Sequence, residues 1–175
     1  KAPGKAISFT ASESTTVERR PKLILRVTID VQEMVDTILG TKETRNGVKR
    51  VSRVETITNQ DDGRISILVD WSIPTAKSSA QQLLNKTRND VWRLLLVADR
   101  LGPALDQICL KGTYELEHKF GRLSEEVIVD ATYKSDTVDK INWERFKEKN
   151  VFDIADKSEF HSTFEAIVET EPFAD

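Results

Sequence analysis

The hydrophobic pattern of residues 111–146 constrains the fold more than any other part of the chain, because its period changes within that stretch. Apolar and polar residues alternate on both sides of Phe120-Gly121, and apolar residues then recur at helical spacing from about residue 136. Alternation predicts β-strands, and a glycine between two alternating runs predicts a turn. We therefore expect a β-hairpin formed by residues 108–118 and 123–133, followed by a short amphipathic helix over residues 136–147.

An earlier part of the chain predicts a second hairpin and a long helix. Residues 50–58 and 64–73 form the two arms of this hairpin, and Asp62-Gly63 supplies the positive φ of a tight turn. Residues 75–101 contain neither glycine nor proline and carry apolar residues at helical spacing. A helix of that length is about 40 Å long, which is enough to cross a sheet, and Gly102-Pro103 is expected to end it.

The N-terminal region is expected to contribute a tether, a strand and a helix. Residues 1–20 are mostly small and polar, which predicts a flexible polar tether ahead of a single domain over residues 21–175. Residues 22–30 are rich in aliphatic and β-branched side chains and predict a strand. Asp30 is placed to cap the following helix, and Gly40 is placed to end it.

Together these patterns predict an α+β fold. We expect an antiparallel sheet of about five strands, built from the two hairpins, with one long and two or three shorter helices packed on one face. Trp71, Tyr133, Val69 and Leu95 are expected to lie in the core. Residues 160–168 carry apolar side chains, but their pattern favours neither a strand nor a helix.

Charge and cysteine content limit the partners. The 175 residues carry a formal net charge of −3, which argues against the basic surface that nucleic-acid binding needs. No apolar run approaches the roughly 18 residues of a membrane-spanning helix, so we expect no membrane span in this chain. The single cysteine, Cys109, excludes an internal disulfide, and its place in a strand predicts a small buried side chain rather than a nucleophile.

Motifs that carry chemistry are largely missing from the sequence. It contains no glycine-rich phosphate loop, dinucleotide-binding fingerprint, zinc-protease motif or serine-hydrolase motif. We therefore expect no catalytic residue, no metal and no cofactor. The alternative is a hydrolase whose site the fold assembles from scattered acidic residues together with His118 and His161.

One stretch near the C-terminus brings together side chains that are typical of a small binding pocket. Within about twenty residues it contains an indole, an amide, two carboxylates and an imidazole. These predicted binding residues are Asn142, Trp143, Asp153, Asp156 and His161. In the alternative interpretation, Asn142 and Asp156 cap backbone groups while Trp143 fills the edge of the core.

The same part of the chain resembles a family of uncharacterised bacterial secreted proteins and lipoproteins. In that family a strand pair around a Lys-aromatic-Gly turn precedes an Ile-Asn-Trp helix and an Ala-Asp segment followed by a histidine. The family's usual Asp before the turn is His118 here, and its Tyr is Phe120. The residues that carry the resemblance are Gly112-Thr113-Tyr114, Lys119-Phe120-Gly121, Val129-Asp130-Ala131-Thr132-Tyr133, Asp139-Lys140-Ile141-Asn142-Trp143, Asp153-Ile154-Ala155-Asp156 and His161.

This resemblance implies an extracytoplasmic location and implies no activity. A chain that begins at Lys1 with a polar stretch is also expected of a processed exported protein, the alternative being a trimmed cytosolic fragment. The sequence therefore favours a non-enzymatic, secreted or envelope-tethered binding or accessory domain whose partner is a protein or a component of the cell envelope. The hydrolase described above and a cytosolic protein-interaction domain remain the alternatives.

Overall fold

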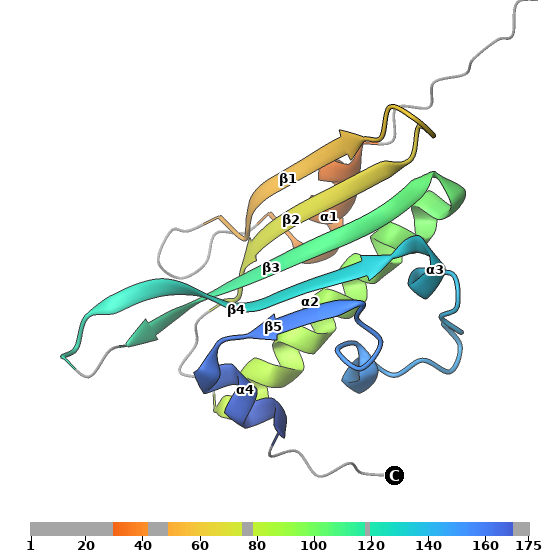
Figure 1. The fold of residues 1–175 in the computed structure, drawn as a ribbon. Helices are drawn as coiled ribbons and strands as arrows, with labels where there is room; N and C mark the ends of the chain where they lie inside the picture. Colours follow the sequence, from red (N-terminus) through yellow and green to blue (C-terminus); the bar gives the residue numbers. More distant parts are fainter. Residues whose placement is uncertain (1–29, 42–48, 75–78, 118–119, 170–175) are drawn as a thin grey trace, which may run out of the picture.

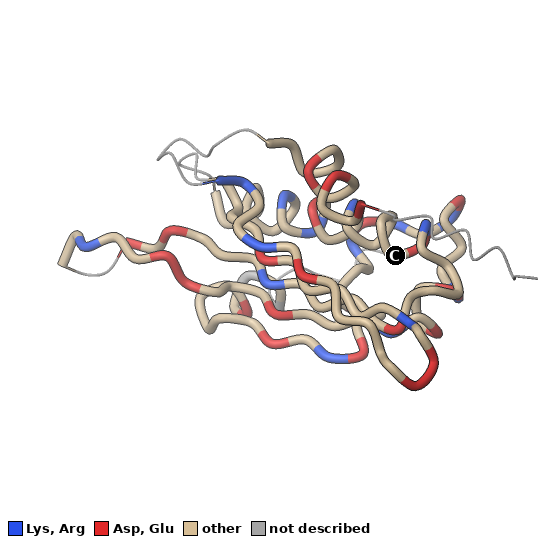
Figure 2. Tube along the Cα trace, turned by 90° about the horizontal axis from the view of Figure 1, so that it is seen from above, with Lys and Arg blue, Asp and Glu red and all other residues tan. Residues whose placement is uncertain are grey.

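The computed structural model of this chain describes residues 30–41, 49–74, 79–117 and 120–169. Within these residues the chain forms two layers: a five-stranded sheet and a group of helices packed against one of its faces (Figures 1 and 2). The predicted α+β class, the two hairpins and the long helix are confirmed. The predicted tether and the predicted strand over residues 22–30 lie outside the described residues, except for Asp30.

The strands lie side by side in the order of the sequence. The strands are β1 (Val51–Thr58), β2 (Ile65–Ser72), β3 (Leu105–Glu117), β4 (Leu123–Lys134) and β5 (Lys157–Phe160). The helices are α1 (Val31–Leu39), α2 (Ala80–Leu101), α3 (Ser135–Val138) and α4 (Ser162–Glu169), with 3-10 turns η1 (Gly102–Ala104) and η2 (Glu148–Asn150).

The turns form where the sequence predicts them. Gly63, between β1 and β2, has φ 74°, and Gly121, between β3 and β4, has φ 73°. Both values lie in the left-handed region, which glycine enters without a steric penalty. At the start of α1, the Asp30 carboxylate accepts a hydrogen bond from Glu33 N at 3.0 Å, as expected of a capping residue.

One pair of neighbouring strands differs from the antiparallel expectation. β2 and β3 run parallel, whereas the β1–β2, β3–β4 and β4–β5 pairs are antiparallel. The physical reason is the long connection: α2 starts after the end of β2 and carries the chain back to the other end of the sheet before β3 begins. Such a helical crossover joins parallel neighbours.

The core lies between α2 and the sheet. The face of α2 that meets the strands is mostly apolar, and Val69 on β2 and Leu95 on α2 are both completely buried. Helix α2 starts with a capping box, in which Ser79 and Gln82 each bond the other's backbone N–H. Trp71 and Tyr133 are fully buried, as predicted, and the Tyr133 hydroxyl donates a hydrogen bond to Val151 O at 2.9 Å.

The predicted helix over residues 136–147 is wrong. α3 ends at Val138, and the chain continues through turns until η2. Two features explain the difference. The Asn142 side chain accepts a hydrogen bond from Glu144 N at 3.2 Å, which offers the backbone an alternative to the helix. The rings of Trp143 and Phe146 then pack edge to face, so side-chain packing determines the backbone conformation of this segment.

The structure also shows which elements form in residues 160–168, for which the sequence favoured neither a strand nor a helix. β5 ends at Phe160, and after His161 the chain enters α4. Phe160 and Phe164 both pack against Phe152, with ring centroids 5.1 and 6.2 Å away. The apolar residues of this segment are therefore divided between a short strand and a short helix. For this reason the segment as a whole shows neither the alternation of a strand nor the spacing of a helix.

Candidate functional site

The five predicted binding residues lie between α3 and α4 in the chain, but their contacts lead to different neighbours. Trp143 is half-buried, and its ring packs edge-on against Trp92 of α2 and against Phe146, with centroid distances of 6.3 and 6.1 Å. The indole N–H groups of Trp92 and Trp143 are both shielded from solvent and have no hydrogen-bond partner among the described residues. Trp143 thus joins the irregular segment after α3 to the long helix.

Asp156 and His161 bond to backbone groups. The Asp156 carboxylate accepts a hydrogen bond from Lys134 N at 2.8 Å and one from the Thr137 side chain, and so holds the start of α3. Burial raises the pKa of this carboxyl, but these hydrogen bonds and the nearby Lys134 charge outweigh it, and the net pKa is lowered. His161 Nδ1 accepts a hydrogen bond from Thr163 N at 3.3 Å at the start of α4.

A small hollow of about 210 Å³ lies beside this region. Of the five predicted residues, Asn142 lines it, whereas Asp153 is an exposed residue of the following turn. The lining consists of Thr137, Lys140, Ile141, Asn142, Phe146 and Ile154. Because Asn142 and Asp156 already bond backbone N–H groups, the geometry agrees with the alternative interpretation of these two residues, and a binding role for the five stays a prediction.

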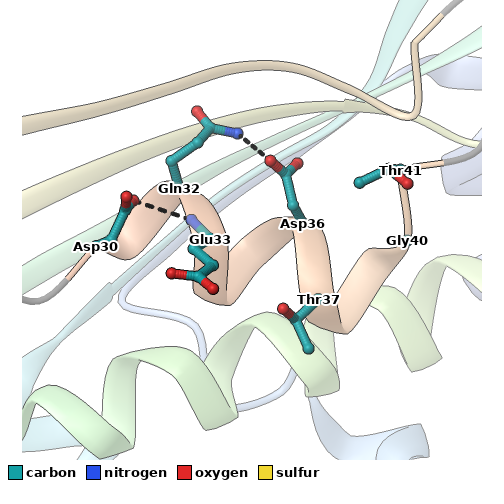
Figure 3. A pocket seen from close by; sticks show the side chains of 7 residues that line it. All are labelled: Asp30, Gln32, Glu33, Asp36, Thr37, Gly40 and Thr41. Carbon is teal, nitrogen blue, oxygen red and sulfur yellow. Dashed lines mark hydrogen bonds between the residues drawn. The ribbon is translucent and has the colours of Figure 1, made fainter.

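A larger and more open hollow lies on α1 (Figure 3). It measures about 640 Å³, and its walls carry three carboxylates, those of Asp30, Glu33 and Asp36. Two of these already make local bonds: Asp30 caps the helix, and Asp36 accepts a hydrogen bond from Gln32 Nε2 at 3.0 Å. These bonds are typical of an exposed helix surface, so the hollow supplies no chemistry of its own.

A buried ion pair lies between α2 and the sheet and was not predicted. Arg50 Nη2 lies 2.5 Å from Asp90 Oδ2, and both side chains are 7% exposed. Arg50 also donates to Ser72 O, and Trp71 Nε1 donates to Asp90 Oδ2 at 3.3 Å. Burial raises the pKa of the Asp90 carboxyl, and the Arg50 guanidinium and the Trp71 N–H oppose that effect.

This ion pair contributes to the structure rather than to a surface site. Its polar atoms bond to one another and to the backbone across β1, β2 and α2, so it fixes how the first hairpin meets the long helix. The sequence does contain a signal for it. Asp90 occupies the apolar stripe of α2 between Leu83 and Leu94, and a lone carboxylate on a buried face requires a partner.

The sheet face that points away from the helices is mostly polar where the strands are paired, although Ile57 of β1 is an exposed apolar residue there. Lys111 Nζ lies 3.4 Å from Asp130 Oδ2, and Lys157 Nζ lies 2.8 Å from Glu159 Oε1. Cys109 lies on this face and is only partly buried, so the prediction that it is buried is wrong. The reason is that the described helices all pack on the other face. Opposite charges compensate each other here, which is typical of a solvated surface.

The β3–β4 hairpin extends beyond the other strands, as Figure 1 shows. β2 follows β3 only as far as Thr113, and β5 pairs with β4 only from Val129 to Thr132. Beyond these points the two long strands pair only with each other in the described part of the sheet. We call residues 114–117 and 120–127 the arm.

The arm exposes apolar side chains on one surface. Gly112 faces the helices, because the space next to it is filled by Trp71, and the next residue, Thr113, therefore faces away from them. Thr113 pairs with Val127, so Val127 and Leu123 share this outward surface. Val127 is 45% exposed and Leu123 is 60% exposed. Phe120, in the turn of the arm, is 80% exposed.

The outward surface of the arm is also acidic. Glu115 and Glu125 lie directly opposite each other, and Glu117 lies opposite Leu123. Thr113 Oγ1 donates a hydrogen bond to Glu125 Oε1 at 2.6 Å, which confirms that these side chains share one surface. Figure 2 shows the acidic positions along the arm, and Arg122 is a cation near its tip. The arm therefore combines apolar and acidic side chains in a fixed alternation.

Comparisons with family models, with curated proteins and with solved structures found no match for this chain. Within the described ranges, no group of three or more His, Cys, Asp or Glu side chains is arranged to hold a metal ion. No helix of the described chain has both the length and the apolar character needed to cross a bilayer. His118, which the hydrolase alternative requires, lies outside the described residues.

Proposed function

We propose that this chain is a non-enzymatic binding domain that engages a protein partner through the arm. The observation that carries the proposal is the exposure of Leu123 and Val127 on one surface of a projecting hairpin. Single exposed apolar residues are common, but apolar residues gathered on one projecting surface are typical of an interaction site. The neighbouring sheet face differs from the arm, because it is mostly polar and its opposite charges compensate each other.

The shape of the arm also supports a binding role. A two-stranded ribbon leaves backbone N–H and C=O groups along both of its edges, and such edges pair readily with another chain. The rigid sheet at the base of the arm holds the ribbon away from the helices, which gives a partner access to it. In line with the sequence resemblance, we propose that the domain acts outside the cytoplasm, as a secreted or envelope-tethered protein.

Site-specific photocrosslinking tests the binding role. A photoreactive phenylalanine analogue replaces Leu123 in cells that make the protein, and the same analogue replaces Glu33 on the exposed side of α1 as the control. We expect a discrete crosslinked product from position 123 and no such product from position 33. The Val127→Lys substitution is expected to reduce the yield of the product from position 123. Equal products from both positions, or no product from position 123, would contradict the proposal.

A further inference from the structure

We propose that the partner is an extended protein segment that adds as a strand along the free edge of β4 and carries a Lys or Arg flanked by apolar residues two positions away on each side. This inference rests on the proposed binding role of the arm. It adds the mode of binding and the chemistry of the partner.

The edge of β4 is open along the arm. β5 pairs with Val129 to Thr132, and one further backbone bond, from His161 N to Ile128 O, lies just beyond that pairing. Residues 123–127 have β3 on one side and no described strand on the other. An added strand would continue the line of β5 toward the tip of the arm, and backbone hydrogen bonds would supply a sequence-independent part of its affinity.

The side chains of β4 determine what this strand must carry. Leu123, Glu125 and Val127 alternate along the outward surface, so a paired strand places one residue beside each of them. Apolar residues suit the positions beside Leu123 and Val127, and a cation suits the position beside Glu125. The pattern apolar-x-cation-x-apolar is symmetric, so it holds whether the added strand runs parallel or antiparallel to β4.

The opposing carboxylates strengthen the case for a cation. Glu115 on β3 lies directly opposite Glu125, so a positive charge beside Glu125 approaches two acidic side chains. The electrostatic preference therefore belongs to the arm itself and does not depend on the rest of the domain.

A second copy of this chain fits the edge less well. In an antiparallel pair of two β4 edges centred on Glu125, each Leu123 would lie beside the Val127 of the other copy, which is favourable. The two Glu125 side chains, however, would then lie beside each other, which disfavours the pair. The charge on this edge thus selects a basic segment from another protein over self-association.

Peptide titration tests the inference. The probes are two synthetic peptides, acetyl-Thr-Val-Thr-Lys-Thr-Val-Thr-amide and the same peptide with Glu in place of Lys, and the readout is the backbone amide spectrum of the isotope-labelled full chain. For the Lys peptide we expect shifts at residues 123–127 and a dissociation constant about ten-fold lower than for the Glu peptide. Glu125→Lys is expected to reverse that preference, and Glu125→Gln to reduce it.

Control variants separate the edge from the rest of the sheet. Leu123→Lys is expected to weaken binding of the Lys peptide about ten-fold, whereas Ile57→Lys, at an exposed apolar residue of β1, leaves it unchanged. The inference is overturned if the Lys peptide causes no shifts at about 1 mM, if both peptides bind equally, or if the shifts lie on β1. If neither peptide binds while position 123 still gives a specific crosslinked product, the binding role of the arm is supported and strand addition along β4 is contradicted.

Discussion

At the scale of single residues, Gly112 shows how closely the core is packed. A Cβ atom at this position would lie 2.7 Å from Val129 Cγ1 and 2.9 Å from the Trp71 ring. Both neighbours are fully buried, so neither can move away freely. The glycine is therefore required by the close approach of β2, β3 and β4 rather than by an unusual backbone conformation.

Replacing this glycine is expected to destabilise the protein. Gly112→Ala should lower the free energy of unfolding by about 1–3 kcal/mol, the usual cost of overfilling a packed core, as measured by chemical denaturation. The same change in a Val129→Ala background should cost clearly less, because the closest contact is then removed. An equal cost in both backgrounds would show that the contact with Val129 is not the cause.

The Arg50–Asp90 pair gives a second prediction at this scale. Arg50→Met leaves the Asp90 carboxylate buried without its cation, and the expected loss of unfolding free energy is about 3–5 kcal/mol. Arg50→Met combined with Asp90→Asn should cost less than Arg50→Met alone, because no uncompensated charge is buried. Thermal and denaturant unfolding of the three proteins measures this. A double variant less stable than the single one would contradict a structural ion pair.

Asp156 predicts a pH dependence. Because its folded-state pKa is lowered, the carboxylate stabilises the protein fully at pH values above its ordinary pKa, and this contribution is lost as the pH falls through that value toward the folded-state pKa. Asp156→Asn should therefore be less stable than the wild type at neutral pH, and the difference should shrink between about pH 5 and pH 3. Asp153→Asn serves as an exposed control. A difference that stays constant with pH would contradict this role.

At the scale of elements, the packing of α2 against the sheet holds the two layers together. Val69→Ala and Leu95→Ala should each lower the free energy of unfolding by roughly 2–4 kcal/mol, because both side chains are fully buried in the core. Equilibrium denaturation in urea measures both changes. Losses under about 1 kcal/mol for both variants would show that the packing of the long helix on the sheet is not the main contact of the core.

Elements with a strong local signal could be predicted from the sequence, and elements shaped by their neighbours could not. The hairpins have alternation and a turn glycine, and α2 has a long stripe without breakers, so each segment determines its own structure. The segment after α3 has helical spacing as well, but the Asn142 turn and the packing of Trp143 against Trp92 prevail over it. A one-dimensional pattern contains neither of these competing contacts.

The candidate sites show the same division. Asn142, Asp156 and His161 are polar residues near a Trp in the sequence, and this proximity predicted a pocket. In the structure each of them also bonds a backbone group, which the sequence does not reveal, and the binding role stays a prediction. The arm was predicted only as part of a hairpin. Its projection depends on where β2 and β5 end, and alternation within β3 and β4 does not report the length of their neighbours.

At the scale of the whole molecule, the domain divides into a folded body and a projecting ribbon. The body contains the apolar core, the ion pair and the helices on one face of the sheet. The arm exposes apolar and acidic side chains beyond that body, which is the basis of the proposed binding role. If that role is correct, the stability of the fold should not depend on the part of the arm beyond Glu115 and Glu125.

Shortening the arm tests this division most directly. Glu115 and Glu125 are opposite each other, so an Asn-Gly turn in place of residues 116–124 closes the hairpin at that pair. We expect the free energy of unfolding, measured by chemical denaturation, to change by no more than about 1 kcal/mol, because Leu123 and Phe120 are already exposed in the folded protein. A loss greater than about 3 kcal/mol would show that the arm belongs to the folded body, and would contradict its assignment as a binding element.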